Sequence, residues 1–173
     1  IDGAPSMISV ANQRLFTRKP AIQNLKYQHI HLSHCCVDDL EQIRGASVIV
    51  SNSLLHHLHN PHTLWDAVKQ LAAPNAFIFH RDLRRPSTEQ EVDVLCDRYV
   101  SEAPSVLQRD FRASLKAAFT VDEVSEQLAL AGLRQFKVKE IGYRYLGVRG
   151  WGEPGCCLDH SRSGWSVRQR DHE

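Results

Sequence analysis

The chain has 173 residues, of which 42% are hydrophobic, and its formal net charge at pH 7 is +1. These values predict one globular domain with a sizeable core, and they exclude the strong positive field of a nucleic-acid-binding protein. No apolar run reaches the roughly 18 residues of a membrane-spanning helix, and no basic-then-apolar leader opens the chain, so we expect neither membrane insertion nor secretion.

The cysteines indicate a reducing environment. They form two adjacent pairs and a singleton: Cys35, Cys36, Cys96, Cys156 and Cys157. This spacing fits neither a disulfide framework nor the C-x₂-C pinch of a zinc site. We therefore predict free thiols and a cytoplasmic protein.

The first half of the chain predicts a parallel crossover unit. Residues 26–31 and 46–51 have strand character, and the second segment is nearly all apolar, as in a buried parallel strand. Asn60–Pro61 predicts a helix start, with Asn as N-cap and Pro at the first helical position, and Pro74 ends that helix. A further buried strand follows at residues 76–80, and the short connections predict a right-handed strand–helix–strand unit.

Two helices are predicted next, over residues 87–116. Ser87 can cap the first helix, Ala103–Pro104 separates the two, and apolar residues recur at helical spacing in the second. Thr120 to Glu123 is a capping box that opens another helix, which Gly132 is placed to end.

The C-terminal part predicts two strands and a tail. Residues 134–141 and 143–150 flank Gly142 and are expected to pair antiparallel. From Trp151 onward no periodicity remains, so we divide the chain into a domain over residues 1–150 and an irregular or disordered tail over residues 151–173.

The segment "SNSLLHHLHNP", residues 51–61, contains the most distinctive cluster of polar residues. His56 and His59 could share a helix face as metal ligands do, but no cysteine or carboxylate lies nearby in sequence to complete a site, and we predict no metal. The histidines are then either half-buried polar residues at a strand end or the lining of a cleft. We favour the cleft, because ligands of open α/β sheets lie beyond the carboxyl ends of the strands.

Together with "AAPNAFIFHRDLRRP" and "FTVDEVSEQLALAGL", which follow in this order, residues 51–61 make the chain resemble the class I S-adenosylmethionine-dependent methyltransferases. The small-molecule members are the most similar, over roughly residues 1–150. The resemblance implies an α/β fold: a Rossmann-like methyltransferase sheet in the order 3-2-1-4-5-7-6, mostly parallel with a C-terminal antiparallel strand.

The resemblance also implies cofactor-binding residues in the first part of the chain. "IDGAPSM" is similar to the end of the second strand, where an acidic residue accepts hydrogen bonds from the ribose hydroxyls, so Asp2 would take that role. "HCCVDDL" is similar to the turn that holds the adenine. Cys36 stands there at the usual position of an Asp, and Asp38 is the neighbouring carboxylate.

The segment beneath the methionine part of the cofactor is matched by Ser51, Asn52 and Ser53. His56 and His57 resemble the "HH" that often follows and faces the substrate, and we predict them as catalytic residues, His57 first. "PNA" replaces the family's Pro-Gly-Gly, and Asn75 can adopt the left-handed conformation required there. Methyl transfer from a sulfonium needs mainly alignment of the acceptor and, for some acceptors, removal of a proton.

The acceptor would lie under the helices of residues 87–116, which are expected to form a lid. Arg81 and Arg84 are predicted to bind a carboxylate or phosphate of the substrate, together with Arg85, Arg109 and Arg112. The alternative is that these arginines form a solvated basic face.

The family's glycine-rich loop precedes the acidic residue matched by Asp2 and would lie before Ile1. We therefore expect an N-terminally truncated domain that lacks the first strand and its helix, and a weakened hold on the cofactor. Residues 46–51 would then be an exposed apolar edge, which predicts a homodimer through this strand or an N-terminal part that moves to cover it.

Two functions follow. The first is S-adenosylmethionine-dependent methyl transfer to a small-molecule acceptor, weakened or lost in a truncated chain. The second is a non-catalytic, truncated methyltransferase-like fragment that acts as a dimeric interaction or ligand-binding module.

Overall fold

The computed structural model describes residues 1–17, 26–28, 30–32, 40–41 and 43–152. The elements are α1 (Pro5–Thr17), β1 (Ala46–Asn52), the short 3₁₀ helix η1 (Leu55–His57), α3 (His62–Leu71), β2 (Ala72–Leu83), α4 (Glu89–Val100), α5 (Ser105–Ala117), α6 (Val121–Leu130), β3 (Lys137–Ile141) and β4 (Tyr145–Trp151). No helix within these ranges is long and apolar enough to cross a membrane.

The four strands form one sheet in the order β1-β2-β4-β3. β1 and β2 are parallel, whereas β4 is antiparallel to both β2 and β3. The predicted parallel crossover through α3 and the predicted antiparallel pair around Gly142 are both confirmed. In the family's strand numbering this order is 4-5-7-6, with the last strand in sequence reversed, as the resemblance implied.

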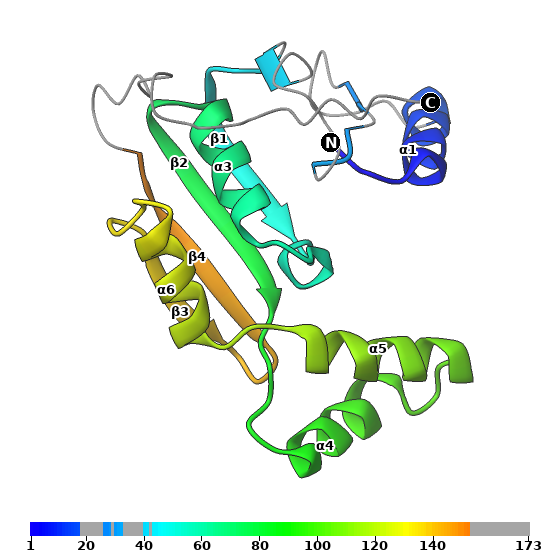
Figure 1. Cartoon of the computed structure of the whole chain (residues 1–173). Coiled ribbons are helices and arrows are strands. Elements are labelled where there is room, and N and C mark those ends of the chain that lie inside the picture. The colour runs from blue at the N-terminus through cyan, green and yellow to red at the C-terminus, as the bar shows by residue number, and fades with distance from the viewer. Residues whose placement is uncertain (18–25, 29, 33–39, 42, 153–173) are drawn as a thin grey trace, which may run out of the picture.

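One face of the sheet carries the main core. α3 and α6 lie side by side over this face (Figure 1). Trp65 of α3 and Leu128 of α6 are buried against Ile78 and Val148 of the sheet. Each such apolar side chain contributes about 1.5–3 kcal/mol by leaving water, so this layer holds β1 and β2 in register.

The predicted lid helices α4 and α5 lie beyond the carboxyl end of β2 (Figure 1). They enclose a second, smaller core in which Leu95 and Leu115 pack against Leu83, the last residue of β2. α5 also contacts η1. The two helices are therefore placed at the edge of the sheet where the polar segment of β1 ends.

Several local signals act as the sequence predicted. Thr120 and Glu123 form both hydrogen bonds of the capping box at the start of α6. Gly132, Gly142 and Asn75 adopt the left-handed conformation, with φ of 76°, 61° and 59°. Glycine and asparagine tolerate this region of backbone space at little cost, so the chain can turn at the two glycines and accommodate the irregularity of β2 at Asn75.

The boundaries of α3 and β2 differ from expectation. α3 begins at His62, and the Asn60 side chain accepts a hydrogen bond from the His62 N–H at 3.1 Å. β2 begins at Ala72, directly after α3 ends at Leu71, so Pro74 lies within the strand and does not end the helix as predicted. It fits there because the register with β1 shifts between Ala46 and Val48, and an irregularity of this kind tolerates a residue without an N–H.

The cap of α4 was predicted one residue too early. Thr88, not Ser87, is the N-cap, and its hydroxyl accepts a hydrogen bond from the Glu91 N–H at 3.2 Å. The Glu91 carboxylate in turn accepts from the Ser87 N–H at 2.7 Å. Ser87 and Thr88 therefore both bond to Glu91 at the helix start, but Thr88, three residues before Glu91, is the N-cap.

The strand predicted over residues 26–31 is not formed by the described residues of that segment. Instead, the Asp2 N–H donates to the Gln28 carbonyl and the Ile30 N–H donates to the Asp2 carbonyl, at 3.2 and 3.0 Å. Two hydrogen bonds place the N-terminus beside this segment without building a ladder.

β4 extends to Trp151, which we had assigned to the tail, and the Gly152 N–H donates to the Ala76 carbonyl at 2.8 Å. The remainder of the predicted tail, residues 153–173, lies outside the described residues.

Candidate functional site

The candidate site begins where β1 ends. Asn52 is paired with Arg81 of β2, and the next residue, Ser53, turns the chain with a positive φ of 53° while its N–H donates to the Arg81 carbonyl at 2.9 Å. The chain then enters η1. The polar segment predicted to face a ligand therefore leaves the sheet at its carboxyl edge, as ligand-binding turns of open α/β sheets do.

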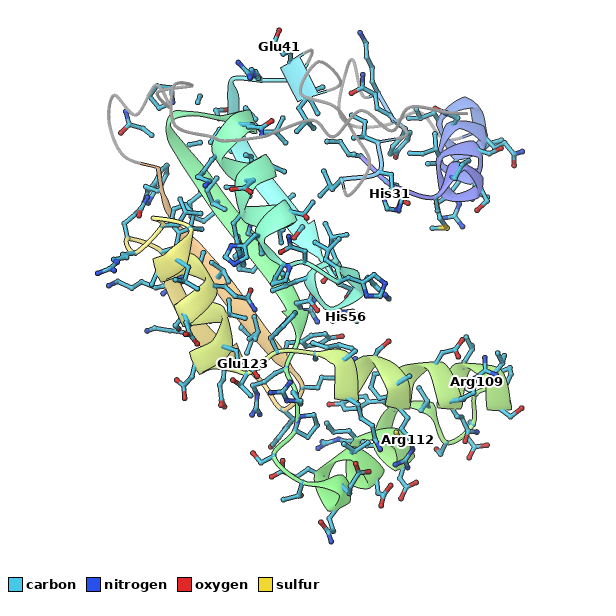
Figure 2. The ribbon with its side chains drawn as sticks, viewed as in Figure 1. His31, Glu41, His56, Arg109, Arg112 and Glu123 are labelled. Carbon is cyan, nitrogen blue, oxygen red and sulfur yellow. The ribbon has the colours of Figure 1, made fainter. Side chains whose placement is uncertain are left out.

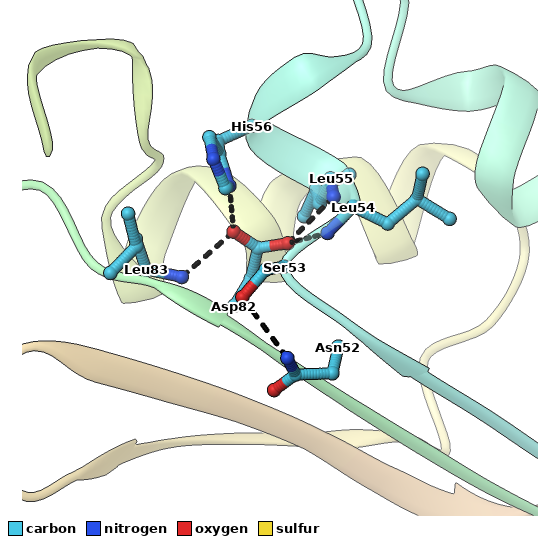
Figure 3. Close-up of polar contacts among 7 residues, drawn as sticks. All are labelled: Asn52, Ser53, Leu54, Leu55, His56, Asp82 and Leu83. Carbon is cyan, nitrogen blue, oxygen red and sulfur yellow. Dashed lines mark hydrogen bonds and ion pairs between the residues drawn. The ribbon is translucent and has the colours of Figure 1, made fainter. Parts of the chain in front are cut away.

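This turn is held by one buried carboxylate, Asp82 of β2 (Figure 3). Its Oδ2 accepts hydrogen bonds from the Leu54 and Leu55 N–H groups at 2.8 and 2.6 Å, and its Oδ1 accepts one from the Leu83 N–H at 2.7 Å. The Nδ1 atom of His56 lies 2.5 Å from Oδ1. Asp82 is only 3% exposed, and these four partners compensate for the loss of water around its charge.

The two histidines predicted as catalytic have different environments. The His56 side chain is 4% exposed and is bonded to Asp82, whereas His57 is exposed. Their ring centroids are 4.0 Å apart. Partial burial lowers the pKa of His57, and the neighbouring His56 lowers it further, against a smaller raising effect of Asp82. His57 is therefore neutral at pH 7 and able to accept a proton.

A second buried histidine, His80 of β2, lies behind the site. Its Nδ1 is 2.5 Å from the Ser51 hydroxyl, and its ring is nearly perpendicular to that of Trp65, with centroids 5.4 Å apart. Burial lowers the pKa of His80 to about 4, and the Asp82 charge offsets this only in part. The ring is neutral at pH 7, and its buried Nε2 has no hydrogen-bond partner in the described part of the chain.

A hollow of about 970 Å³ brings several predicted residues together. Ser51, Asn52, Ser53 and His57 line it from the end of β1, and Asp2 lines it from the N-terminal segment. Its size is that of a pocket for a nucleotide-sized ligand. His56 does not line the hollow, so it can affect the site only indirectly, by its contact with His57 and by its place in the turn.

The residues present fit an S-adenosylmethionine molecule in two respects. Asp2 brings a carboxylate to the hollow, and its Oδ1 accepts a hydrogen bond from the Ala4 N–H at 2.8 Å. His80 also borders the hollow and keeps a buried ring nitrogen without a partner within the described ranges. Cys36 and Asp38, the residues matched to the adenine turn, lie outside the described residues, so their role stays a prediction.

The five arginines predicted to gather under the lid do not share one site. Four of them pair with separate carboxylates: Arg84 with Glu140, Arg85 with Glu123, Arg109 with Asp110, and Arg112 with Asp93 and Glu89. Arg109 lies near the end of α5 that is remote from the sheet (Figure 2). Arg81 differs from these four, since its guanidinium carbon lies 3.8 Å from the centre of the Tyr145 ring. Binding of substrate by Arg81 and Arg84 stays a prediction, and the contacts favour Arg81.

Sequence reasoning missed Asp82 and His80, although a signal for both exists. In a strand, alternate residues share one face, so Ile78, His80 and Asp82 lie on the same buried face of β2. Polar residues at the carboxyl end of an otherwise apolar buried face are the signal that indicates a functional role. The described residues contain no group of three or more histidine, cysteine or acidic side chains placed to hold a metal ion.

No family model and no curated protein matches the sequence. The structure, however, resembles those of known methyltransferases. An S-adenosylmethionine-dependent methyltransferase from Aquifex aeolicus superposes with a TM-score of 0.55 at 16% identity, over 86% of this chain and 65% of that one. An O-methyltransferase family protein from Burkholderia thailandensis superposes with a TM-score of 0.60 at 14% identity, over 89% of this chain and 43% of that one.

Human N-acetylserotonin methyltransferase, whose structure contains S-adenosylmethionine, gives a TM-score of 0.55 at 15% identity over 88% of this chain and 39% of that one. The chain thus spans between 39% and 65% of the length of these three proteins. The strand order and these likenesses define the fold as that of the S-adenosylmethionine-dependent methyltransferases. The chain covers part of that fold.

Proposed function

We propose that this chain provides the acceptor side of an S-adenosylmethionine-dependent methyltransferase that acts on a small molecule. The observation that supports the proposal is the hollow at the carboxyl edge of the sheet, where Asp2 and the residues of the β1 turn line the same space. The strand order 4-5-7-6 also supports the proposal, because ligands of such sheets bind at the carboxyl edge.

In this arrangement Asp2 would hold the ribose hydroxyls of the cofactor, and the segment Ser51–Ser53 would lie beneath its methionine part. Cys36 and Asp38 would lie near the adenine. When bound, the cofactor supplies a methyl group already activated on a sulfonium. The protein then needs to bind the acceptor, keep it aligned with that methyl group and exclude water.

His57 is the residue that we propose to receive a proton from the acceptor. It is exposed to the hollow, and its lowered pKa leaves it neutral at pH 7. His56 supports it from behind, because Asp82 fixes the His56 ring and the two rings lie in contact. Asp82 is a positioning residue in this scheme: it orders the turn that carries His57.

Calorimetric titration with S-adenosylhomocysteine tests the cofactor site. We expect micromolar binding that Asp2→Ala weakens at least tenfold, because it removes an acceptor of charge-assisted hydrogen bonds. Asp110→Ala, an exposed carboxylate on α5, is the matched control and should bind like the wild type. Absence of heat at millimolar ligand, or an equal loss in both variants, would contradict the proposal.

The second candidate function is a non-catalytic interaction module, and we propose a homodimer through β1 as the assembly it would use. β1 is the edge strand of the described sheet, and Val48 and Val50 on it are 57% and 67% exposed. An apolar strand edge of this kind pairs readily with another strand. A dimer is also compatible with methyl transfer, so the oligomeric state cannot distinguish the two functions. The titration with S-adenosylhomocysteine distinguishes them.

The proposed location is the cytoplasm, on the grounds of the cysteine pattern in the sequence. Cys96, the cysteine that falls within the described ranges, is a buried free thiol.

A further inference from the structure

A chain of alternating arginines and tyrosines connects the sheet edge with α4. We call it the arginine–tyrosine ladder, and it consists of Arg81, Tyr145, Arg144, Tyr99, Arg98 and Tyr143. The guanidinium carbons of Arg81 and Arg144 lie 3.8 and 4.8 Å from the centre of the Tyr145 ring. Arg144 also lies 3.7 Å from the Tyr99 ring centre, and Arg98 lies 5.7 and 4.9 Å from the ring centres of Tyr99 and Tyr143.

The charges of the ladder are not neutralised within the described ranges. No carboxylate there lies within ion-pair distance of Arg81, Arg98 or Arg144. The Nε of Arg81 is buried and has no hydrogen-bond partner among the described residues. Arg84, which flanks the ladder, differs in its terminal nitrogens, which contact Glu140 and the Tyr143 carbonyl, although its buried Nε also has no partner among the described residues.

This combination favours an anionic ligand. Because the guanidinium carbons of Arg81 and Arg144 lie 3.8 and 4.8 Å from the same ring centre, their separation cannot exceed the sum of these two distances. This limit is close to the Debye length of about 8 Å at physiological ionic strength, so salt screens their repulsion only in part. Stacking on a ring face leaves the in-plane N–H donors available, and these match the oxygens of a carboxylate or phosphate. An oxyanion that accepts hydrogen bonds from Arg81 and Arg144 would offset this repulsion and provide partners for the free donors.

The ladder is placed next to the candidate site. Arg81 is the register partner of Asn52, which lines the hollow, and Arg144 lies in the turn between β3 and β4. Tyr99 belongs to α4, one of the two helices beyond the carboxyl edge. The ladder is therefore adjacent to the hollow through the Asn52–Arg81 pair and reaches α4, although none of its six residues lines the hollow itself.

We propose that the arginine–tyrosine ladder binds an oxyanion, a carboxylate or a phosphate, and that this group belongs to the methyl acceptor. The assignment of the oxyanion to the acceptor rests on the proposed methyltransferase function, whereas oxyanion binding by the ladder does not. Arg81 and Arg144 form the core of the site, and Arg98 lies at its outer end. The acceptor class is then a small anionic molecule, and the two kinds of oxyanion are separated by experiment.

The test is NMR of the arginine side-chain Nε–H groups during titration with sodium benzoate and, separately, with inorganic phosphate at constant ionic strength. We expect the Arg81 and Arg144 signals to shift with saturation in the millimolar range for at least one of the two probes. Preference for benzoate indicates a carboxylate ligand, and preference for phosphate indicates a phosphate ligand. Signals that stay unchanged with both probes overturn the proposal.

Variants make the assignment specific. Arg144→Gln should weaken binding of the preferred probe about tenfold, since one charge-assisted partner is lost. Arg109→Gln, an exposed arginine on α5 that pairs with Asp110, is the matched control and should leave the affinity unchanged. If Arg144→Gln does not fold by circular dichroism, Arg81→Lys replaces it, because lysine retains the charge but loses the planar stacked fork. An equal effect of the control variant overturns the proposal.

The outcome is separable from that of the cofactor titration. Anion binding without S-adenosylhomocysteine binding retains the ladder site and rejects the methyltransferase proposal. S-adenosylhomocysteine binding without anion binding retains the methyltransferase proposal and rejects the ladder site.

Discussion

At the scale of single residues, Asp82 determines the geometry of the candidate site. One carboxylate accepts three backbone N–H groups and contacts His56, and all of these partners except Leu83 lie 26 to 28 residues away in sequence. Because the donors come from the turn after β1, the carboxylate couples the end of one strand to the end of its neighbour. The position of His57 follows from this coupling.

We predict that Asp82→Asn destabilises the protein by about 3 kcal/mol, because it leaves buried hydrogen-bond donors without a partner. An amide has one acceptor oxygen instead of two, so some of the four donors lose their partner. Urea unfolding at pH 7 measures the change. Asp93→Asn, which removes an exposed partner of Arg112, is the control and should cost less than about 1 kcal/mol. Similar losses in both variants would contradict the role of Asp82.

At the scale of elements, the β1–α3–β2 unit combines predictable and unpredictable features. The strand at β1 and a helix beginning near Asn60–Pro61 are local signals, and both elements are present. The cap of α3 is displaced by one residue, because Pro61 and not Asn60 is its N-cap, and β1 is more exposed than a buried parallel strand. The early start of β2 at Ala72 depends on the register shift opposite Ala46 and Val48, which is a property of the pair of strands. No local pattern in "AAPNA" indicates it, because proline and asparagine are typical of loops.

The free edge of β1 leads to a prediction at this scale. If the chain dimerises through β1, Val50→Lys should shift it to monomer, because an inward or edge lysine disfavours strand pairing. Analytical ultracentrifugation across a concentration series measures the change. Val94→Lys, which replaces a similarly exposed valine on α4, should leave the assembly unchanged. A wild-type protein that sediments as a monomer at all concentrations would reject the dimer.

At the scale of the whole molecule, two cores share one strand. β2 carries Ile78 into the core beneath α3 and α6, and Leu83 into the core of α4 and α5. His80 lies between them on the same strand, buried and neutral at pH 7. The stability of the molecule should therefore respond to the protonation of this one ring.

The sign of that response follows from the pKa of His80, about 4 in the folded protein against 6.5 as the ordinary value. Between these two values the unfolded chain binds more protons, so the free energy of unfolding is fully present above pH 6.5 and falls as the pH decreases toward 4. The shift corresponds to about 3 kcal/mol. The lowered pKa of His57 acts in the same direction.

Urea unfolding at pH 7.5 and 4.5 measures this loss of stability. In His80→Gln the difference between the two pH values should be smaller than in the wild type by about 2–3 kcal/mol. His59→Gln replaces an exposed histidine between η1 and α3 and should retain the wild-type difference in the free energy of unfolding. If His80→Gln also retains it, another group is responsible for the acid sensitivity.

The sequence alone predicted the order of the elements, because apolar periodicity, helix caps and turn residues act over a few positions. Thr120, Gly132 and Gly142 are examples in which one residue type specifies one local conformation. The resemblance to methyltransferases also predicted that one C-terminal strand is antiparallel, and β4 has this orientation. Its prediction that the turn after β1 faces a ligand stays a prediction, which the hollow beside that turn supports.

The tertiary structure decided which side chains meet. Asp82 reaches the turn at Leu54, and Arg81 and Arg144 reach the same tyrosine ring, only because the strands pair in one register. Burial likewise distinguishes His80, whose pKa falls to about 4, from the exposed His57 and His59, although the three look alike in the sequence. Contacts between distant segments and the exclusion of water depend on packing, and no local pattern of residues encodes them.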